Sequence, residues 1–112
     1  MRAIIAEDWG DPTVPEDARS MIEWSPYHNI RDRVEYPAVY QVFGAEDGGC
    51  RPFQARKFTA RLEEANAGDR PIHMRVWPNT GHAPAADAAA YTAEWLAFVM
   101  DQIGLTAKGP PA

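Results

Sequence analysis

Two short apolar runs, residues 38–43 and 72–77, most constrain the fold of this 112-residue chain. Each run follows a proline and precedes a loop that contains glycine, which is typical of a strand bounded by turns. Between them, apolar residues recur at spacings of three and four, which predicts a helix that begins at Pro52 and ends at Gly68. A second helical pattern, residues 86–103, follows the second run. This order predicts an α/β fold in which a right-handed crossover joins two parallel strands.

The two runs predict different degrees of burial. Residues 38–43 are mostly apolar, as in a strand buried on both faces of a parallel sheet. Residues 72–77 alternate between apolar and polar or larger side chains, which indicates one wetter face near a sheet edge. The last helix carries an aromatic stripe at helical spacing, which we expect to pack on the sheet, and Gly104 is its expected C-terminal cap. The stripe consists of Tyr91, Trp95 and Phe98.

The ends of the chain have weaker patterns. Residues 1–33 are expected to form an irregular arm that contains one short helix, residues 16–24. Residues 106–112 are rich in proline and glycine and are expected to form a flexible tail. We therefore expect residues 1–112 to be one partial domain. A chain of this size buries only roughly two thirds of its unfolded surface, which provides little stabilisation for a two-strand unit that stands alone.

Charge and composition exclude several classes of function. The net charge of −5 argues against nonspecific nucleic-acid binding, which needs a basic face. No stretch approaches the roughly 20 apolar residues of a membrane helix, so no membrane partner is expected. Cys50 is the only cysteine, which suits a reducing compartment. We expect a cytoplasmic location, with the periplasm as the alternative if an upstream signal exists.

An acid and a histidine follow the two predicted strands. Asp47 comes after the first strand and His82 comes after the second. Parallel strands end at one edge of a sheet, so both loops should meet there, and Gly44, Gly48, Gly49 and Gly81 should let them turn tightly. Acid before histidine is the late half of the Ser–Asp–His order of α/β-hydrolases. We expect the two side chains to approach within roughly 2.6–3.2 Å. The alternative is a loop acid and a loop histidine without contact.

The nucleophile of that order is missing. The pattern Gly-x-Ser-x-Gly does not occur, and neither Ser20 nor Ser25 has flanking glycines at that spacing. Cys50 is interpreted as a packed, inert thiol, with a Cys–His nucleophile pair as the alternative. His28 lies in a turn and is expected to have a structural role there. The three histidines lack the spacing of metal ligands, so neither a metal nor a cofactor is expected.

Four segments, in order along the chain, match motifs of one enzyme family. They are Trp24-Ser25-Pro26-Tyr27-His28-Asn29-Ile30 beside the family's YSPYHNV, Tyr36-Pro37-Ala38-Val39 beside its YPAVL, Asp47 ahead of residues 52–58, and Gly81-His82 beside its GH. Over roughly residues 8–105 the chain thus resembles the C-terminal part of the prolyl oligopeptidase family of serine peptidases. The resemblance implies an α/β-hydrolase domain that cleaves short peptides, often after proline. It also implies that Asp47 is the triad acid and His82 the triad histidine.

The chain departs from the family at several places. The family often has a substrate-binding arginine two residues after the acid, where this chain has Gly49. The family usually has glycine after the histidine, where this chain has Ala83. The β-propeller that filters substrates in the family, the nucleophile elbow and the strands before it have no counterpart in these residues. We therefore expect a C-terminal fragment of a serine peptidase that supplies Asp47 and His82 to a serine held elsewhere, and no activity of the isolated chain.

The alternative function is a non-catalytic interaction module. Without preceding strands, the strand at residues 38–43 would expose one edge with unpaired backbone groups. Such an edge favours pairing with a second copy of the chain or with a separately encoded N-terminal portion.

Overall fold

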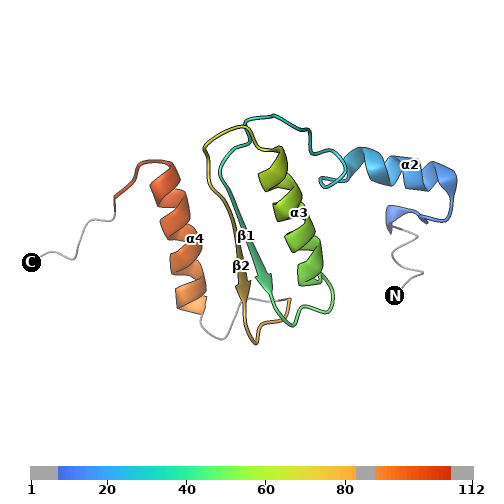
Figure 1. The fold of residues 1–112 in the computed structure, drawn as a ribbon. Helices are drawn as coiled ribbons and strands as arrows, with labels where there is room; N and C mark the ends of the chain where they lie inside the picture. Colours follow the sequence, from blue (N-terminus) through green and yellow to red (C-terminus); the bar gives the residue numbers. More distant parts are fainter. Residues whose placement is uncertain (1–7, 83–87, 107–112) are drawn as a thin grey trace, which may run out of the picture.

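The computed structural model describes residues 8–82 and 88–106 (Figure 1). Its elements are α2 (Pro15–Trp24), β1 (Val39–Gly44), α3 (Pro52–Ala65), β2 (Ile72–Trp77) and α4 (Ala88–Gln102). β1 and β2 pair in parallel, from Val39 opposite Ile72 to Gly44 opposite Trp77. The predicted α/β order and the parallel pairing are confirmed. The predicted helix start at Ala86 and residues 107–112 of the predicted tail lie outside the described residues.

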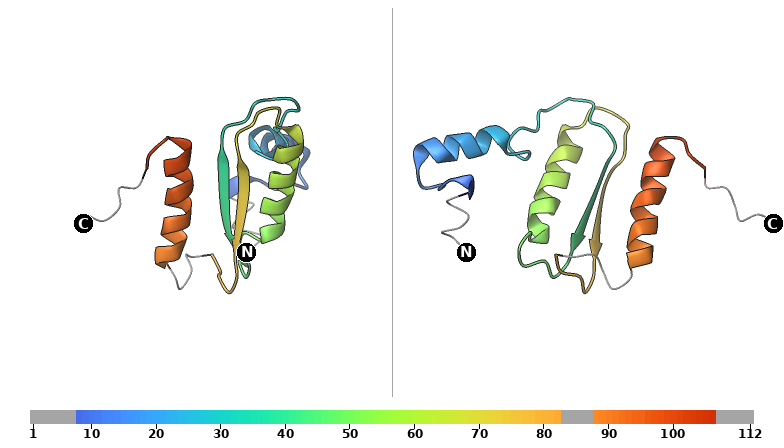
Figure 2. Two further views of the ribbon diagram at one scale, coloured as in Figure 1. Left: turned by 60° about the vertical axis from the view of Figure 1, so that its left-hand side comes forward. Right: turned by 180° about the vertical axis from the view of Figure 1, so that it is seen from behind.

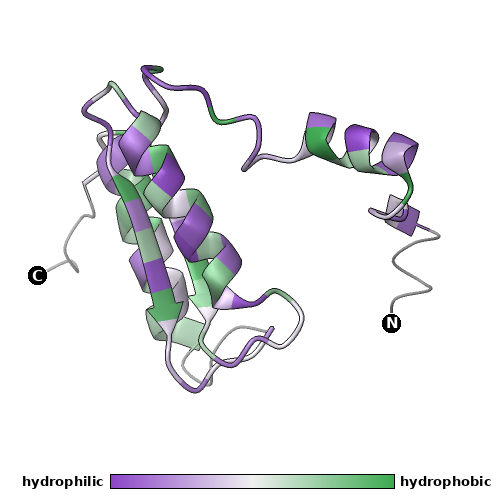
Figure 3. Cartoon of the chain, turned by 45° about the vertical axis from the view of Figure 1, so that its right-hand side comes forward, coloured by the Kyte–Doolittle hydropathy of each residue, from purple (hydrophilic) through white to green (hydrophobic). Residues whose placement is uncertain are grey.

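The two-stranded sheet lies between two helices. Figure 2 shows α3 against one face of the sheet and α4 along the other. The buried core belongs to the α3 side and consists of Ala55, Leu62, Ala65 and Ile72. Hydrophilic positions interrupt hydrophobic ones along α3 (Figure 3), as expected for a helix that buries one stripe. This packing fixes the crossover between the strands, and therefore the relative position of their carboxyl ends.

The α4 side is covered less completely. Phe98 stacks on Tyr40 with ring centroids 5.1 Å apart, and Tyr91 approaches Trp77 at 6.2 Å. The predicted packing of the aromatic stripe on the sheet therefore occurs, but Trp95 remains 37% exposed and no described residue of α4 is fully buried. The prediction that the first strand is buried on both faces is wrong, because most of β1 is half-buried. Among the described residues β1 has β2 as its only partner strand.

The N-terminal arm is held along α3. An isolated parallel bridge pairs Val34 with Asn66, and the Arg33 N–H donates to the Ala65 carbonyl at 2.8 Å. Asp32 forms an ion pair with Arg61 of α3 at 2.6 Å. Figure 1 places α2 beyond α3, on the side away from the sheet. The expected arm therefore contains a helix and a defined attachment, and α2 matches the short helix predicted from the sequence.

Two helix ends test the expected caps. Gly68 does not end α3, because the helix stops at Ala65 and Asn66 already has extended backbone angles. The Asn66 side-chain oxygen then accepts the Gly68 N–H at 3.1 Å, which holds the turn. Gly104 is confirmed as the cap of α4, since its φ of +70° lies in the left-handed region that glycine tolerates. Within residues 8–82 and 88–106, no helix combines the length and the apolar character that a membrane span requires.

Candidate active site

The loops after β1 and β2 lie side by side at the carboxyl edge of the sheet. Backbone hydrogen bonds continue beyond the strands, from the Ala45 N–H to the Trp77 carbonyl at 2.8 Å and from the Glu46 N–H to the Thr80 carbonyl at 2.9 Å. The second of these bonds ties the loop that carries Asp47 to the loop that carries His82. The positions of the two side chains therefore follow from the parallel register of the strands.

Gly44 makes this close approach sterically feasible. A Cβ atom at position 44 would overlap the backbone carbonyl oxygens of Thr80 and Gly81. A Cβ atom at Gly48 or Gly81 would meet open space. None of the four glycines expected to turn these loops has a positive φ. The requirement for glycine at position 44 is therefore one of space between two backbones and not of backbone conformation.

Asp47 is a buried carboxylate that accepts hydrogen bonds from three groups. Its side chain is 6% exposed, and its Oδ1 atom accepts the backbone N–H groups of Gly49 and Cys50 at 2.8 Å each. Its Oδ2 atom lies 2.9 Å from Nδ1 of His82. The Cys50 N–H, followed by the His82 ring, lowers the pKa of Asp47 below its usual value of 3.8. Asp47 is therefore ionised at neutral pH.

This contact determines which nitrogen of the His82 ring faces Asp47 and carries a proton there. An ionised carboxylate only accepts hydrogen bonds, so Nδ1 of His82 must donate its proton to Asp47. In a neutral imidazole the other nitrogen, Nε2, then carries a free lone pair. The His82 side chain is 76% exposed, and Nε2 has no hydrogen-bond partner among the described residues. The expected approach of Asp47 and His82 is confirmed, and the arrangement presents a base to an open surface.

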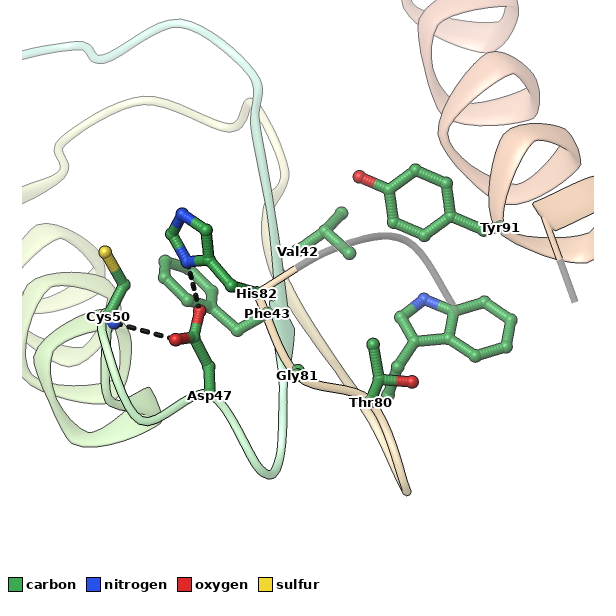
Figure 4. Close-up of a pocket in the computed structure, with 10 residues that line it drawn as sticks. Val42, Phe43, Asp47, Cys50, Thr80, Gly81, His82 and Tyr91 are labelled. Carbon is green, nitrogen blue, oxygen red and sulfur yellow. Dashed lines mark hydrogen bonds and ion pairs between the residues drawn. The ribbon is translucent and has the colours of Figure 1, made fainter. Parts of the chain in front are cut away.

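A pocket adjoins the pair (Figure 4). Its volume is about 260 Å³, and it lies between the two loops, the end of the sheet and the start of α4. Aromatic and small side chains form its wall around the polar Asp47–His82 pair. The lining residues are Val42, Phe43, Gly44, Asp47, Cys50, Trp77, Thr80, Gly81, His82 and Tyr91. A small apolar hollow beside an oriented base is suited to hold a group on which a proton transfer takes place.

The two serines lie in the N-terminal arm, apart from this pocket. Ser20 belongs to α2, and the Ser25 hydroxyl lies 2.8 Å from Nδ1 of His28 within the turn after α2. The expected structural role of His28 agrees with this contact. Neither serine makes a hydrogen bond to His82 in the part of the chain that the structure describes.

Cys50 differs from the sequence interpretation. It was expected to be packed, but it is exposed. A ligand atom from each of Asp47, Cys50 and His82 lies within 4.8 Å of the other two. The reason is the tight turn after Asp47, in which the Cys50 N–H returns to the carboxylate. In the sequence, the three-residue separation of Asp47 and Cys50 indicated that these two residues lie close together. The sequence did not indicate that the Cys50 side chain also lies close to His82.

Comparison with known proteins gives a consistent match. The family model described as "Prolyl oligopeptidase family" matches residues 3–106. Dipeptidyl aminopeptidase BI of Pseudoxanthomonas mexicana is 29% identical over 105 residues. This match covers 91% of the present chain and 14% of that protein. The chain thus spans about one seventh of the length of this curated relative.

Solved structures give the same result for the fold. A structure from an analysis of two prolyl endopeptidases superimposes with a TM-score of 0.86 at 27% identity, covering 91% of this chain and 16% of the other. A thermophilic esterase from Thermogutta terrifontis superimposes with a TM-score of 0.58 at 24% identity, covering 76% of this chain and 32% of the esterase. At this identity the similarity to the esterase supports the fold assignment only. The helices and the parallel strand pair are thus a part of an α/β-hydrolase domain.

Proposed function

This chain belongs to the prolyl oligopeptidase family, and from that premise we propose that Asp47 and His82 are the acid and the base of a Ser–Asp–His peptidase triad. The observation that carries the proposal is the 2.9 Å contact between Oδ2 of a buried carboxylate and Nδ1 of an exposed imidazole. The serine would come from outside these 112 residues. In such a triad the carboxylate fixes the imidazole tautomer and stabilises the imidazolium.

The proposed chemistry follows from the orientation of the ring. As the serine oxygen attacks the peptide carbonyl carbon, Nε2 of His82 takes the hydroxyl proton, and the carbonyl oxygen becomes an oxyanion. The carbon–nitrogen bond then breaks, and the imidazolium returns the proton to the leaving amine. Water repeats the sequence on the acyl-enzyme and restores the serine hydroxyl. Asp47 stays ionised throughout, which its three hydrogen bonds favour.

The proposed substrate is a short peptide. The relatives that support this choice are a dipeptidyl aminopeptidase and two prolyl endopeptidases. Gly49 offers no side chain to a substrate backbone, although it lies next to the pair, since a Cβ there would be 3.8 Å from Nδ1 of His82. Substrate recognition would therefore depend on residues other than the one at position 49, which distinguishes the proposed enzyme from relatives that have an arginine there.

The first test transplants the aligned segment into dipeptidyl aminopeptidase BI, in place of its own. We expect the chimera to hydrolyse peptide substrates and His82→Gln to lower kcat by at least about 100-fold, because the general base is lost. His73→Gln is the matched control, since His73 is an exposed residue of β2, and it should leave kcat unchanged. A chimera that folds and retains its activity after His82→Gln would refute the proposal.

The second test uses the 112-residue chain by itself. A fluorophosphonate probe should leave it unlabelled, because Ser20 and Ser25 lie in the arm and not beside His82. Labelling that disappears with Ser25→Ala or Cys50→Ala would contradict this expectation and would identify another nucleophile.

A second candidate function is an interaction module that pairs through its open sheet edge. Two observations favour it: β2 is the only partner of β1 among the described residues, and α4 exposes apolar side chains. These are Trp95, Leu96 and Val99, which are 37–40% exposed. The proposed partner is a second copy of the chain or a separately encoded N-terminal portion that continues the sheet. A stable monomer in sedimentation velocity at high concentration would rule out the second copy.

A further inference from the structure

We propose that Asp47, Cys50 and His82 form a binding site for Zn²⁺. The three residues supply a carboxylate oxygen, a thiol sulfur and an imidazole nitrogen, which are the ligand types that zinc prefers in proteins. One such atom from each residue lies within 4.8 Å of the other two. The short loop after β1 provides two of the ligands, and the loop after β2 provides the third.

Small movements would complete the coordination. Tetrahedral bonds of about 2.0 Å to nitrogen and oxygen place these two atoms roughly 3.3 Å apart. The Asp47 oxygen and the His82 nitrogen are 2.9 Å apart, so they need to separate by only about 0.4 Å. A bond of about 2.3 Å to sulfur requires Cys50 to approach the nitrogen to roughly 3.6 Å. Cys50 is exposed, so its side chain can rotate without disturbing the core.

The charge and the protons also balance. The Cys50 thiol releases its proton to solvent as the sulfur–zinc bond forms. The His82 proton leaves Nδ1, and Nε2, which faces outward, takes one up from solvent. One proton is therefore released for each ion bound. The carboxylate and the thiolate together neutralise the two positive charges of the ion. The exposure of Cys50 and His82 leaves the fourth coordination position to water, as in zinc sites with three protein ligands.

Zinc binding and the proposed triad exclude each other. The ion would replace the proton that joins Nδ1 of His82 to Asp47, so the imidazole could no longer act as an oriented base. Zinc would thus inhibit the enzyme, a consequence that rests on the proposed function. Binding of the ion does not depend on it. Cys50 therefore gains a specific role, which is to convert an acid–base pair into a metal site.

The test is a titration of the full chain with Co²⁺, followed by displacement with Zn²⁺. Coordination of Co²⁺ by a thiolate produces a ligand-to-metal charge-transfer absorption band. Because Cys50 is the only cysteine in the sequence, any such band reports on this site. We expect the band to form and to be lost with Cys50→Ser. His82→Gln and Asp47→Asn should each weaken Zn²⁺ binding by at least about tenfold. His73→Gln is the matched control and should leave binding unchanged.

Two outcomes would overturn the proposal. One is the absence of a thiolate charge-transfer band at millimolar Co²⁺, when circular dichroism shows that the protein is folded. The other is a band of unchanged affinity in His82→Gln, because Cys50 would then bind the ion alone. Neither outcome bears on peptidase activity, which the transplanted segment measures separately.

Discussion

Replacement of Gly44 by alanine tests how the two loops are joined. The new Cβ atom would overlap the carbonyl oxygens of Thr80 and Gly81, so at least one backbone must shift. Overpacking of this kind costs about 1–3 kcal/mol. A shift that breaks the bond from the Glu46 N–H to the Thr80 carbonyl adds about 0.5–1.5 kcal/mol. We therefore expect Gly44→Ala to lower the free energy of unfolding by about 2–4 kcal/mol.

The assay is thermal unfolding followed by circular dichroism, with a nearby glycine as the control. A loss of 1 kcal/mol lowers Tm by roughly 4–8 °C in a domain near this size, so Gly44→Ala should lower Tm by at least about 8 °C. Gly81→Ala adds the same methyl group to open space and should change stability by no more than about 1 kcal/mol. Equal Tm values for the two variants would refute the claim that Gly44 is required by the approach of the loops.

Two further predictions concern single side chains. The Thr59 hydroxyl is buried and has no hydrogen-bond partner among the described residues, so Thr59→Val should stabilise the chain by about 1 kcal/mol in urea denaturation. An unchanged or lower urea midpoint would contradict this account. The Cys50 N–H and the His82 ring lower the pKa of Asp47, so its contribution to stability is complete above pH 3.8 and is lost as the pH falls through the lowered pKa. Asp47→Asn should remove this part of the acid dependence, and identical pH profiles of urea midpoints for both proteins would show that the contacts of Asp47 do not contribute.

The sequence predicted the order of elements because periodicity is a local property. The strand at Val39–Gly44 and the helix at Pro52–Ala65 begin within one residue of their predicted starts. The incomplete burial of β1 was not predictable, because an apolar run does not reveal which neighbouring strands are present. The end of α3 was misplaced, because Asn66 holds the turn through its own side chain. Local patterns therefore determined the elements, and tertiary neighbours determined their environment.

The candidate site was predictable only in part. Asp47 and His82 were predicted to meet, because both follow parallel strands and because the family motifs surround them. The steric requirement for glycine at position 44 comes from a loop that lies more than 30 residues later in the chain, so no local pattern could predict it. The exposure of Cys50 depends on the hydrogen bonds of the preceding turn. Contacts between distant loops thus required the structure.

The most direct test of the central claim is a ¹⁵N NMR measurement of the His82 imidazole in metal-free chain at neutral pH. Because Asp47 accepts a hydrogen bond at 2.9 Å, we expect the neutral form of the ring to carry its proton on Nδ1, with Nε2 unprotonated. Asp47→Asn should remove this preference, while the tautomers of His28 and His73 should not change. A neutral His82 ring with its proton on Nε2 in place of Nδ1, or the same tautomer mixture in both proteins, would contradict the claim that Asp47 orients His82 as a base.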